Sequence, residues 1–278
     1  MSKRRLNWSE EKIKRYIKEG RGNGTGRDYK PWIKVQDFPS LGLCSRVAGW
    51  KTDRVHEFMS NNETRFFYLL EWADDVTDIR EQFPLIHFNE TVAIAEEMGV
   101  KHPMDIESGV PYIMTTDFMI TMNIGGKEKQ MVRTLKMAAD LDKKRVIEKL
   151  EIERRYWGKY NIDWGIVTEK QVPKELAANI EWIHSSYNLE ATNDLSIDEL
   201  KYISNIFKNR LLGNNLAVRV FTDLFDKEMK MELGTSLNIL KHLIAKKEVY
   251  VDIKNKIDLS MPVELMIKDR NYSEVNII

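Results

Sequence analysis

Asp117 and Lys136 are the residues whose types and spacing point most directly to chemistry. They flank a turn segment, NIGGK at residues 123–127, which has strand-like runs on both sides. The Gly-Gly pair suits a two-residue hairpin loop, because both central positions of the favoured turn need φ > 0. In that register Asp117 lies opposite Thr134. Lys136 then lies diagonally across on the same face, roughly 7–8 Å from Asp117.

A carboxylate and an ammonium that converge on one sheet face are the minimum equipment for metal-assisted phosphodiester hydrolysis. Strand parity places Asp117 and Lys136 on the more polar faces of their strands. A loop longer or shorter by one residue would place the two side chains on opposite faces. The alternative interpretation of Asp117 is an ordinary turn or surface carboxylate.

Glu63 is the second candidate. It precedes Phe66, Phe67 and Leu70 at helical spacing, so it shares the buried face of a helix predicted over 61–73. A carboxylate on that face needs a metal, a cation or a hydrogen-bond donor. The alternative is a capping box, in which Glu63 reaches back to Ser60.

Glu153 is the third candidate. It falls on the apolar stripe of a helix predicted over 143–160, between Leu150 and Trp157. An acidic residue on an inward stripe could point toward Asp117. It could equally pair with one of the two arginines that follow it at a helix edge.

The composition limits the class of protein. The chain has 278 residues, of which 42% are hydrophobic, enough for one large domain or two ordinary ones. A single cysteine, Cys44, excludes an internal disulfide and suits a reducing compartment. The apolar runs are too short to span a bilayer, and no signal peptide is predicted. The five histidines are scattered without zinc-site spacing. A cytoplasmic protein is expected.

The net charge is zero, but the charges are unevenly distributed. Residues 1–54 contain 14 Lys/Arg and 6 Asp/Glu, whereas residues 55–100 contain 2 Lys/Arg and 10 Asp/Glu. A basic arm beside an acidic block suits a site that holds a polyanion on one side and a divalent metal on the other. Two solvated faces of a neutral protein are the alternative.

The segment GRGNGTGR at residues 20–27 resembles a phosphate loop in its alternating glycines. A dinucleotide fingerprint follows a strand and opens a helix, whereas this segment follows a predicted helix that Ser9 caps. We interpret it as a flexible basic loop. Arg21, Arg27 and Lys30 are candidates for contact with the DNA backbone, and a plain linker is the alternative.

The predicted element order is α/β, with a mixed sheet flanked by helices. In the first part of the chain the predictions are an extended segment over 78–85, a helix over 91–98, a hairpin over 112–137 and a strand over 164–167. After residue 169 they are helices over 173–186, 196–211, 215–225 and 235–245 and a strand pair over 248–253 and 256–259. We predict two domains: residues 1–169 with a basic N-terminal arm, and a winged-helix-like domain over 170–278.

Several segments in order resemble the TnsA family, the endonuclease subunit of a heteromeric bacterial transposase. They are residues 20–32, 78–85, 101–103, 116–118 and 148–157, and the likeness covers roughly residues 9–185. The resemblance implies a restriction-endonuclease-like N-terminal domain with a PD-(D/E)xK type of site. It also implies a winged-helix-like C-terminal domain that contacts TnsC, the regulatory ATPase subunit.

The resemblance also implies roles for individual residues. The family's glutamate, aspartate and lysine map onto Glu63, Asp117 and Lys136, and a further helix glutamate maps onto Glu153. The usual acidic residue two positions before the lysine is Thr134 here, which removes one carboxylate ligand. The metal shell would then be completed by the Leu135 carbonyl or by the Glu63 carboxylate.

The implied activity is Mg²⁺-dependent hydrolysis of DNA at the 5′ ends of a transposon, with Mn²⁺ as an alternative metal. Asp117 and Glu63 would hold the metal, and Lys136 would position water and stabilise charge on the phosphate. A TnsB-like DDE transposase would recognise the ends and join the 3′ ends. Two alternatives are a non-catalytic adaptor that bridges transposase subunits on DNA and a free-standing restriction-type endonuclease.

Overall fold

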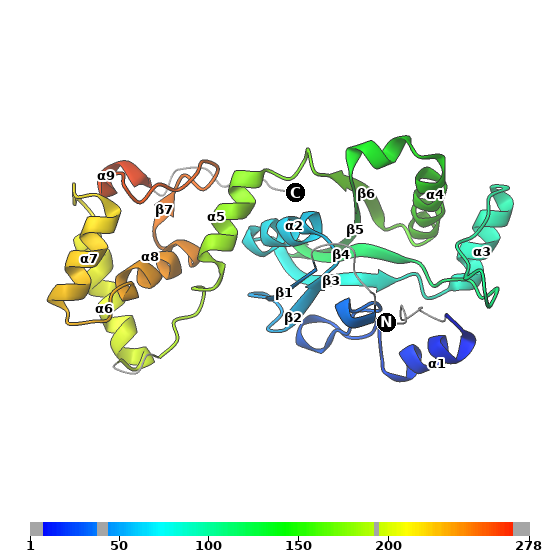
Figure 1. Cartoon of the computed structure of the whole chain (residues 1–278), viewed down its shortest axis with the longest axis horizontal. Helices are drawn as coiled ribbons and strands as arrows, with labels where there is room; N and C mark the ends of the chain where they lie inside the picture. The colour runs from blue at the N-terminus through cyan, green and yellow to red at the C-terminus, as the bar shows by residue number, and fades with distance from the viewer. Residues whose placement is uncertain (1–7, 38–43, 192–194, 269–278) are drawn as a thin grey trace, which may run out of the picture. The chain divides into compact units, whose positions relative to one another are not determined.

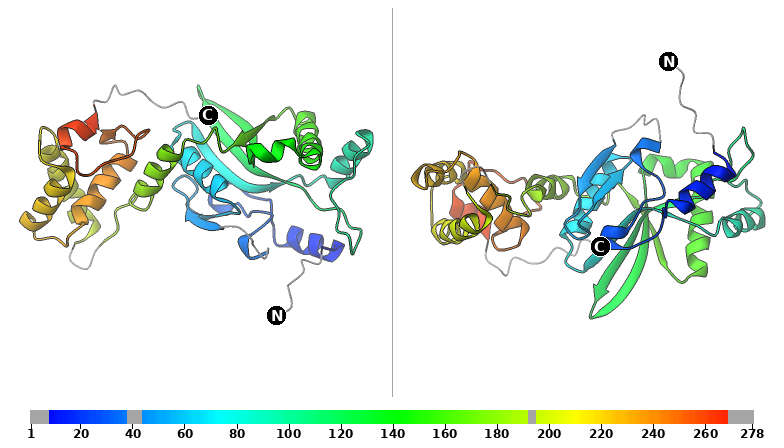
Figure 2. Two further views of the ribbon diagram at one scale, coloured as in Figure 1. Left: turned by 45° about the horizontal axis from the view of Figure 1, so that its top comes forward. Right: turned by 90° about the horizontal axis from the view of Figure 1, so that it is seen from below.

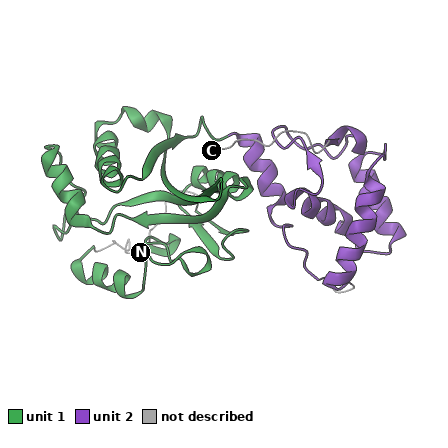
Figure 3. Ribbon diagram, turned by 180° about the vertical axis from the view of Figure 1, so that it is seen from behind, with its two compact units in different colours: residues 1–172 green, residues 173–278 purple. Residues whose placement is uncertain are grey.

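The computed structural model describes residues 8–37, 44–191 and 195–268. The chain forms two compact units, Met1–Val172 and Pro173–Ile278 (Figure 3). The division lies close to the boundary expected after residue 169. Each unit has its own core, and each is described by itself.

The first unit is built on a four-stranded mixed sheet in the order β3-β4-β5-β6 (Figure 1). Its strands are β3 (Val76–Pro84), β4 (Thr115–Ile124), β5 (Lys127–Lys136) and β6 (Asp163–Thr168). The first three are antiparallel neighbours, and β6 runs parallel to β5. A parallel neighbour requires a crossover, which helix α4 (Lys144–Lys159) provides. The predicted mixed sheet with flanking helices is confirmed.

The β4–β5 hairpin has the predicted register. Ile124 pairs with Lys127 and Phe118 pairs with Arg133. The two turn glycines have φ values of 58° and 79°, the conformation that the favoured two-residue loop requires. The tip of the hairpin projects beyond the neighbouring strands (Figure 2), and its residues from 123 to 130 are exposed.

One face of the sheet packs against α4 and α3 (Phe88–Glu97). Met119 of β4 and Val132 of β5 share a buried cluster with Ile152, Tyr156 and Trp157 of α4. These strand residues are directly opposite in the ladder, so they present one continuous apolar surface to the helix.

The other face packs against α2 (Asn61–Trp72). The Phe66 ring meets the Phe118 ring of β4 edge to face at 5.5 Å, and the Phe58 ring lies 5.9 Å from the Phe118 ring. Phe58 ends a short hairpin, β1 (Ser45–Ala48) and β2 (Val55–Phe58), that was not predicted. Strands of four residues with charged side chains carry little of the alternating pattern by which strands are recognised.

The N-terminal helix α1 (Glu10–Lys18) begins after its cap Ser9, as predicted, and the glycine-rich loop follows it. That loop packs against β3, so the prediction of a flexible loop is wrong. Gly22 has φ 80°, and a Cβ there would lie 2.4 Å from Cγ of Pro84. The Tyr29 hydroxyl donates to the main-chain oxygen of Glu81 at 3.0 Å. Short helical turns lie at Gly26–Asp28, Val35–Asp37 and Ala138–Asp142.

The second unit is mainly helical. Its helices are α5 (Lys174–His184), α6 (Ile197–Leu211), α7 (Val218–Glu228), α8 (Thr235–Ala245) and α9 (Val263–Met266). Helix α8 packs against α5, α6 and α7, and the rings of Phe207, Phe221 and Phe225 contact one another. The predicted capping box at Ser196 and Glu199 is present.

The predicted strand pair of this unit is wrong in its second strand. β7 (Tyr250–Val251) pairs with β8 (Ile267–Lys268), and residues 256–259 are not a strand. The Asn179 amide of α5 donates to the main-chain oxygens of Ile253 and Asn255 at 2.8 and 2.7 Å. These bonds hold the chain against α5 where a hairpin turn was expected. The winged-helix assignment stays a prediction.

Across the described residues, no helix combines the length and apolar character needed to cross a membrane.

Candidate active site

The hairpin brings Asp117 and Lys136 together. The Lys136 Nζ lies 3.5 Å from Asp117 Oδ2 and donates to the main-chain oxygen of Leu135 at 2.7 Å. The Leu135 N–H donates to Asp117 Oδ2 at 2.6 Å. The carboxylate, the ammonium and a main-chain carbonyl therefore form one polar cluster at the end of β5.

A local irregularity in the strands accounts for this geometry. The paired residues of β4 and β5 begin at Phe118 and Arg133, one position beyond Asp117. On the other side of β4, Gln82 of β3 has φ +48°, in the left-handed region that non-glycine residues rarely adopt. Asp117 lies at this break, and its side chain accepts the Leu135 N–H of the neighbouring strand.

Glu63 is 7% exposed, and it acts in the cap as well as facing the site. Its carboxylate accepts hydrogen bonds from the Ser60 hydroxyl at 2.8 Å and from the Met59 N–H at 3.0 Å. Burial, reinforced by the negative charge of Asp117, raises the pKa of Glu63 to about 7. The two interpretations of Glu63 are therefore compatible.

Glu153 points inward from α4. Its carboxylate accepts a hydrogen bond from the Thr134 hydroxyl, which lies 3.1 Å from the Thr116 hydroxyl. Burial raises the pKa of Glu153 to about 7, although these hydroxyl groups favour the charged form. The two arginines that follow it pair with Glu151 at 2.7 and 2.8 Å. The edge pairing considered for Glu153 is thus wrong, because Glu151 takes both arginines.

The charge of Lys136 is maintained by its neighbours. Burial alone would lower the pKa of the Lys136 ammonium, but the carboxylates of Asp117 and Glu153 outweigh burial, and the pKa is raised. Lys136 is therefore a permanent cation beside an excess of acidic groups.

The donor atoms of the cluster suit a hard divalent cation. Within the described ranges, no three His, Cys, Asp or Glu side chains are arranged to hold a metal ion. The oxygens of Glu63, Asp117 and the Leu135 carbonyl are nevertheless the ligand type that Mg²⁺ prefers. An ammonium already lies on two of these groups, since Lys136 contacts both Asp117 and the Leu135 oxygen. The residues therefore fit a cation site.

The prediction that Arg21 contacts DNA is contradicted by its burial. Arg21 is 5% exposed. Its guanidinium donates to the main-chain oxygen of Trp32 at 3.0 Å and pairs with Asp37 and with Glu19, the latter at 2.7 Å. These bonds use four of the five guanidinium N–H groups, so Arg21 ties the N-terminal segment together and is buried away from any DNA backbone.

Arg27 and Lys30 differ from Arg21 because they lie on the surface. Arg27 forms an exposed ion pair with Asp53 at 3.3 Å, and Lys30 donates to the main-chain oxygen of Glu19 at 3.2 Å. Exposed pairs of this kind are weak and exchange readily for another partner. Contact of these two residues with DNA stays a prediction.

Sequence reasoning missed Gln82, whose side-chain amide donates to Glu63 Oε2 at 3.3 Å. No periodicity distinguishes a buried glutamine within a strand from a surface one. His56 lies in a separate buried cluster, with Nδ1 2.8 Å from Glu81 Oε2.

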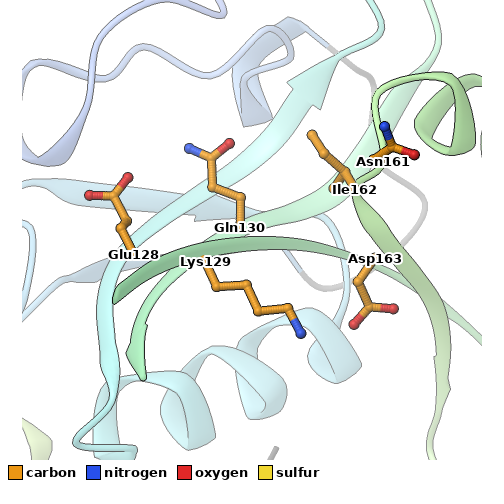
Figure 4. Close-up of a pocket in the computed structure, with 6 residues that line it drawn as sticks. All are labelled: Glu128, Lys129, Gln130, Asn161, Ile162 and Asp163. Atoms are coloured by element: carbon orange, nitrogen blue, oxygen red, sulfur yellow. The ribbon is translucent and has the colours of Figure 1, made fainter. Parts of the chain in front are cut away.

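A polar pocket lies at the opposite end of β5 from the candidate site (Figure 4). It is lined by Glu128, Lys129, Gln130, Asn161, Ile162 and Asp163. None of the candidate residues lines it, so it has no part in the arrangement described above.

Comparison with known proteins relates the chain to one family. Residues 73–169 match the family model described as TnsA-like endonuclease N terminal, and residues 171–253 match TnsA endonuclease C terminal. The chain is also 39% identical over 245 residues to the Transposon Tn7 transposition protein TnsA of Escherichia coli, which covers 88% of this chain and 87% of the relative. With both domains matched in order, the chain belongs to the TnsA endonuclease family.

Proposed function

We propose that this chain is a Mg²⁺-dependent DNA endonuclease that cleaves the 5′ strands at transposon ends. One observation carries the proposal: the carboxylate of Asp117 on β4 lies 3.5 Å from the ammonium of Lys136 on β5, and burial together with the charge of Asp117 raises the pKa of the Glu63 carboxylate on α2. These groups are the equipment of metal-assisted phosphodiester hydrolysis, and membership of an endonuclease family supports that use.

Each residue of the cluster has a role in this proposal. Glu63, Asp117 and the Leu135 carbonyl would hold the ion, Mg²⁺ or Mn²⁺. When bound, the ion polarises the phosphate and lowers the pKa of a water ligand. Lys136 would orient the attacking water and stabilise the negative charge that develops on the phosphate. Glu153, whose carboxylate raises the pKa of Lys136, would keep that side chain charged.

The partners are part of the same proposal. The relative in Escherichia coli is named as a transposition protein of Tn7. We infer that this chain acts on double-stranded DNA with a TnsB-like DDE transposase, which would recognise the transposon ends and join the 3′ ends. The second unit, in the winged-helix-like form proposed for it, would contact a TnsC-like ATPase.

Strand-specific cleavage of transposon-end DNA tests the proposal. The full-length protein is assayed with Mg²⁺ and its cognate transposition partners, and the wild type is compared with Lys136→Ala. Lys129→Ala is the matched control, because Lys129 lies on the same strand with an exposed side chain. Cleavage at the 5′ ends by the wild type and Lys129→Ala, and not by Lys136→Ala, is expected.

Three other outcomes would contradict the proposal. Equal cleavage by the wild type and Lys136→Ala would place the chemistry elsewhere in the complex. Absence of 5′ cleavage by either, with transposition intact, would favour the adaptor. Cleavage by this chain without any partner would instead indicate a free-standing nuclease.

A further inference from the structure

Gln82 links the two elements that carry the carboxylates. Its side chain is 5% exposed and lies between α2 and the start of β4. The amide nitrogen is 3.3 Å from Glu63 Oε2, and the amide oxygen accepts a hydrogen bond from the Thr115 hydroxyl at 3.3 Å. Thr115 is two residues before Asp117, so the amide connects the surroundings of both carboxylates.

The chemistry of the two partners determines which way the amide points. A Glu63 carboxylate that holds a cation is ionised, so it accepts hydrogen bonds and cannot donate one, and the NH₂ end must face it. The Thr115 hydroxyl can donate, so it can satisfy the amide oxygen at the other end. The orientation therefore follows from the hydrogen-bonding network around Gln82.

The main chain at Gln82 is held in an uncommon conformation. Its φ of +48° lies in the left-handed region, which costs energy for a residue with a long side chain. The Trp32 N–H donates to the Gln82 main-chain oxygen at 3.2 Å, and the Tyr29 hydroxyl donates to the preceding carbonyl, that of Glu81. The N-terminal segment thus clamps β3 at this residue, and the unusual φ persists because the surroundings hold it.

We propose that Gln82 is a positioning residue that orients the Glu63 carboxylate for cation binding. The proposal rests on the proposed function, in which Glu63 and Asp117 hold the metal. One Glu63 oxygen is held by Gln82 and the Met59 N–H, and the other by the Ser60 hydroxyl. Without the amide, the side of Glu63 that faces β3 loses its side-chain donor, and the carboxylate plane is less firmly fixed.

Partners that hold a metal ligand in place affect metal affinity without touching the ion. Removing such a group typically weakens metal binding by about 10–100-fold. A purely structural role predicts something different. In that case loss of Gln82 would lower the melting temperature and leave the affinity for the metal unchanged.

Two variants of the full-length protein separate these roles. Gln82→Met keeps the length of the side chain and removes the amide. Gln82→Asn keeps an amide and tolerates the left-handed conformation well, but its side chain is one methylene shorter. Gln82→Asn therefore keeps the test valid if Gln82→Met does not fold. Mn²⁺ affinity is measured by titration calorimetry with transposon-end DNA present, and the melting temperature is measured without metal.

Both variants are expected to bind Mn²⁺ about 10–100-fold more weakly than the wild type. In the cleavage assay with partners, they should need more Mg²⁺ for half-maximal rate, and saturating Mg²⁺ should restore much of the rate. Thr115→Val, which removes only the hydroxyl at the far end of the amide, should shift the Mg²⁺ requirement in the same direction by less.

Wild-type Mn²⁺ affinity in both Gln82 variants would overturn the inference, with or without a lower melting temperature. Asp117→Ala, measured in parallel, separates this failure from failure of the proposed function. If Asp117→Ala loses cleavage and Mn²⁺ binding while the Gln82 variants keep both, only the role of Gln82 is wrong. If Asp117→Ala retains both, the metal site itself is wrong.

Discussion

Adjacent residues of β3 contact two buried clusters with opposite electrostatics. Glu81 belongs to the first, and Gln82 contacts Glu63 of the second. Glu81 is fully buried, yet its carboxylate is well compensated: Arg54 donates to it at 2.8 Å, His56 Nδ1 lies at 2.8 Å and the Glu57 N–H donates at 3.2 Å. Burial alone would raise the pKa of Glu81, but His56 and Arg54 hold it at about 2.

The second cluster is reached through the neighbouring residue, Gln82. There burial and the charge of Asp117 raise the pKa of Glu63 to about 7, and burial raises that of Glu153 to about 7. Lys136 is the cation that faces both of these glutamates and Asp117.

The comparison shows which buried carboxylates are candidates for function. A buried charge that has its own cation and donors stabilises the fold, whereas several carboxylates around one ammonium leave negative charge that a further cation would offset. Burial by itself does not distinguish the two clusters. The number and sign of the compensating groups do.

The largest expected difference between the clusters is in cleavage. Asp117→Ala should lower 5′-strand cleavage by at least about 100-fold, because it removes a proposed metal ligand and the partner of Lys136. Assembly with the partner proteins should remain intact. Cleavage and assembly are measured on the same preparation. The control is Asp163→Ala, which removes an acidic side chain from the neighbouring strand β6.

Loss of assembly in Asp117→Ala would show that Asp117 stabilises the fold, as Glu81 does. The distinction between the two clusters would then fail at its most important member.

The next largest effect is on stability. Glu81→Ala should lower the free energy of unfolding of the first unit by about 3–5 kcal/mol, because Arg54 and His56 would be left buried without their partner. Urea unfolding followed by tryptophan fluorescence measures this change. Glu128→Ala, at an exposed hairpin position, should have little effect. A small change for Glu81→Ala would mean that water compensates the polar groups left without Glu81.

The pH dependence of stability should differ in sign between the clusters. The pKa of Glu81 is lowered in the folded state, so its contribution is present above about pH 4.5 and is lost as pH falls toward 2. The pKa of Glu153 is raised in the folded state, so its contribution to stability is greatest below about pH 4.5 and is lost as pH rises toward 7.

Glu153→Gln should therefore stabilise the metal-free protein at pH 8 by about 3 kcal/mol, since the folded protein no longer ionises a buried carboxyl. At pH 4 the variant and the wild type should be equally stable. Thermal unfolding in a chelator at both pH values measures the difference. A variant less stable than the wild type at pH 8 would mean that the ionised Glu153 carboxylate is compensated by its neighbours, as Glu81 is.

The smallest expected effect concerns the basic residues of the N-terminal segment. Arg27→Ala and Lys30→Ala should each weaken DNA binding slightly and reduce the salt dependence of the affinity by about one ion per residue. Arg21→Ala should lower stability instead, because Arg21 is buried with Asp37. DNA affinity measured over a series of salt concentrations distinguishes the two cases. An unchanged salt dependence in Arg27→Ala and Lys30→Ala would exclude them from the DNA interface.

Turn and cap chemistry made much of the first unit predictable. The Gly-Gly turn determined the hairpin register, and that register predicted that Asp117 and Lys136 would share one face. Ser9 and Ser60 marked the beginnings of α1 and α2. The pattern failed where the strands are short or charged, as in β1 and β2, and at residues 256–259, where Asn179 of a distant helix binds the chain.

The sequence by itself determined which acidic and basic groups share the hairpin and the inward faces of the helices, because turns, caps and periodicity act over a few neighbouring residues. Only the tertiary structure decided which charges are compensated. It buried Arg21 with Asp37, gave Glu81 its cation from Arg54, and placed the Gln82 amide against Glu63. Those partners come from distant parts of the chain, and a local pattern cannot assign them because the pairing depends on how the elements pack.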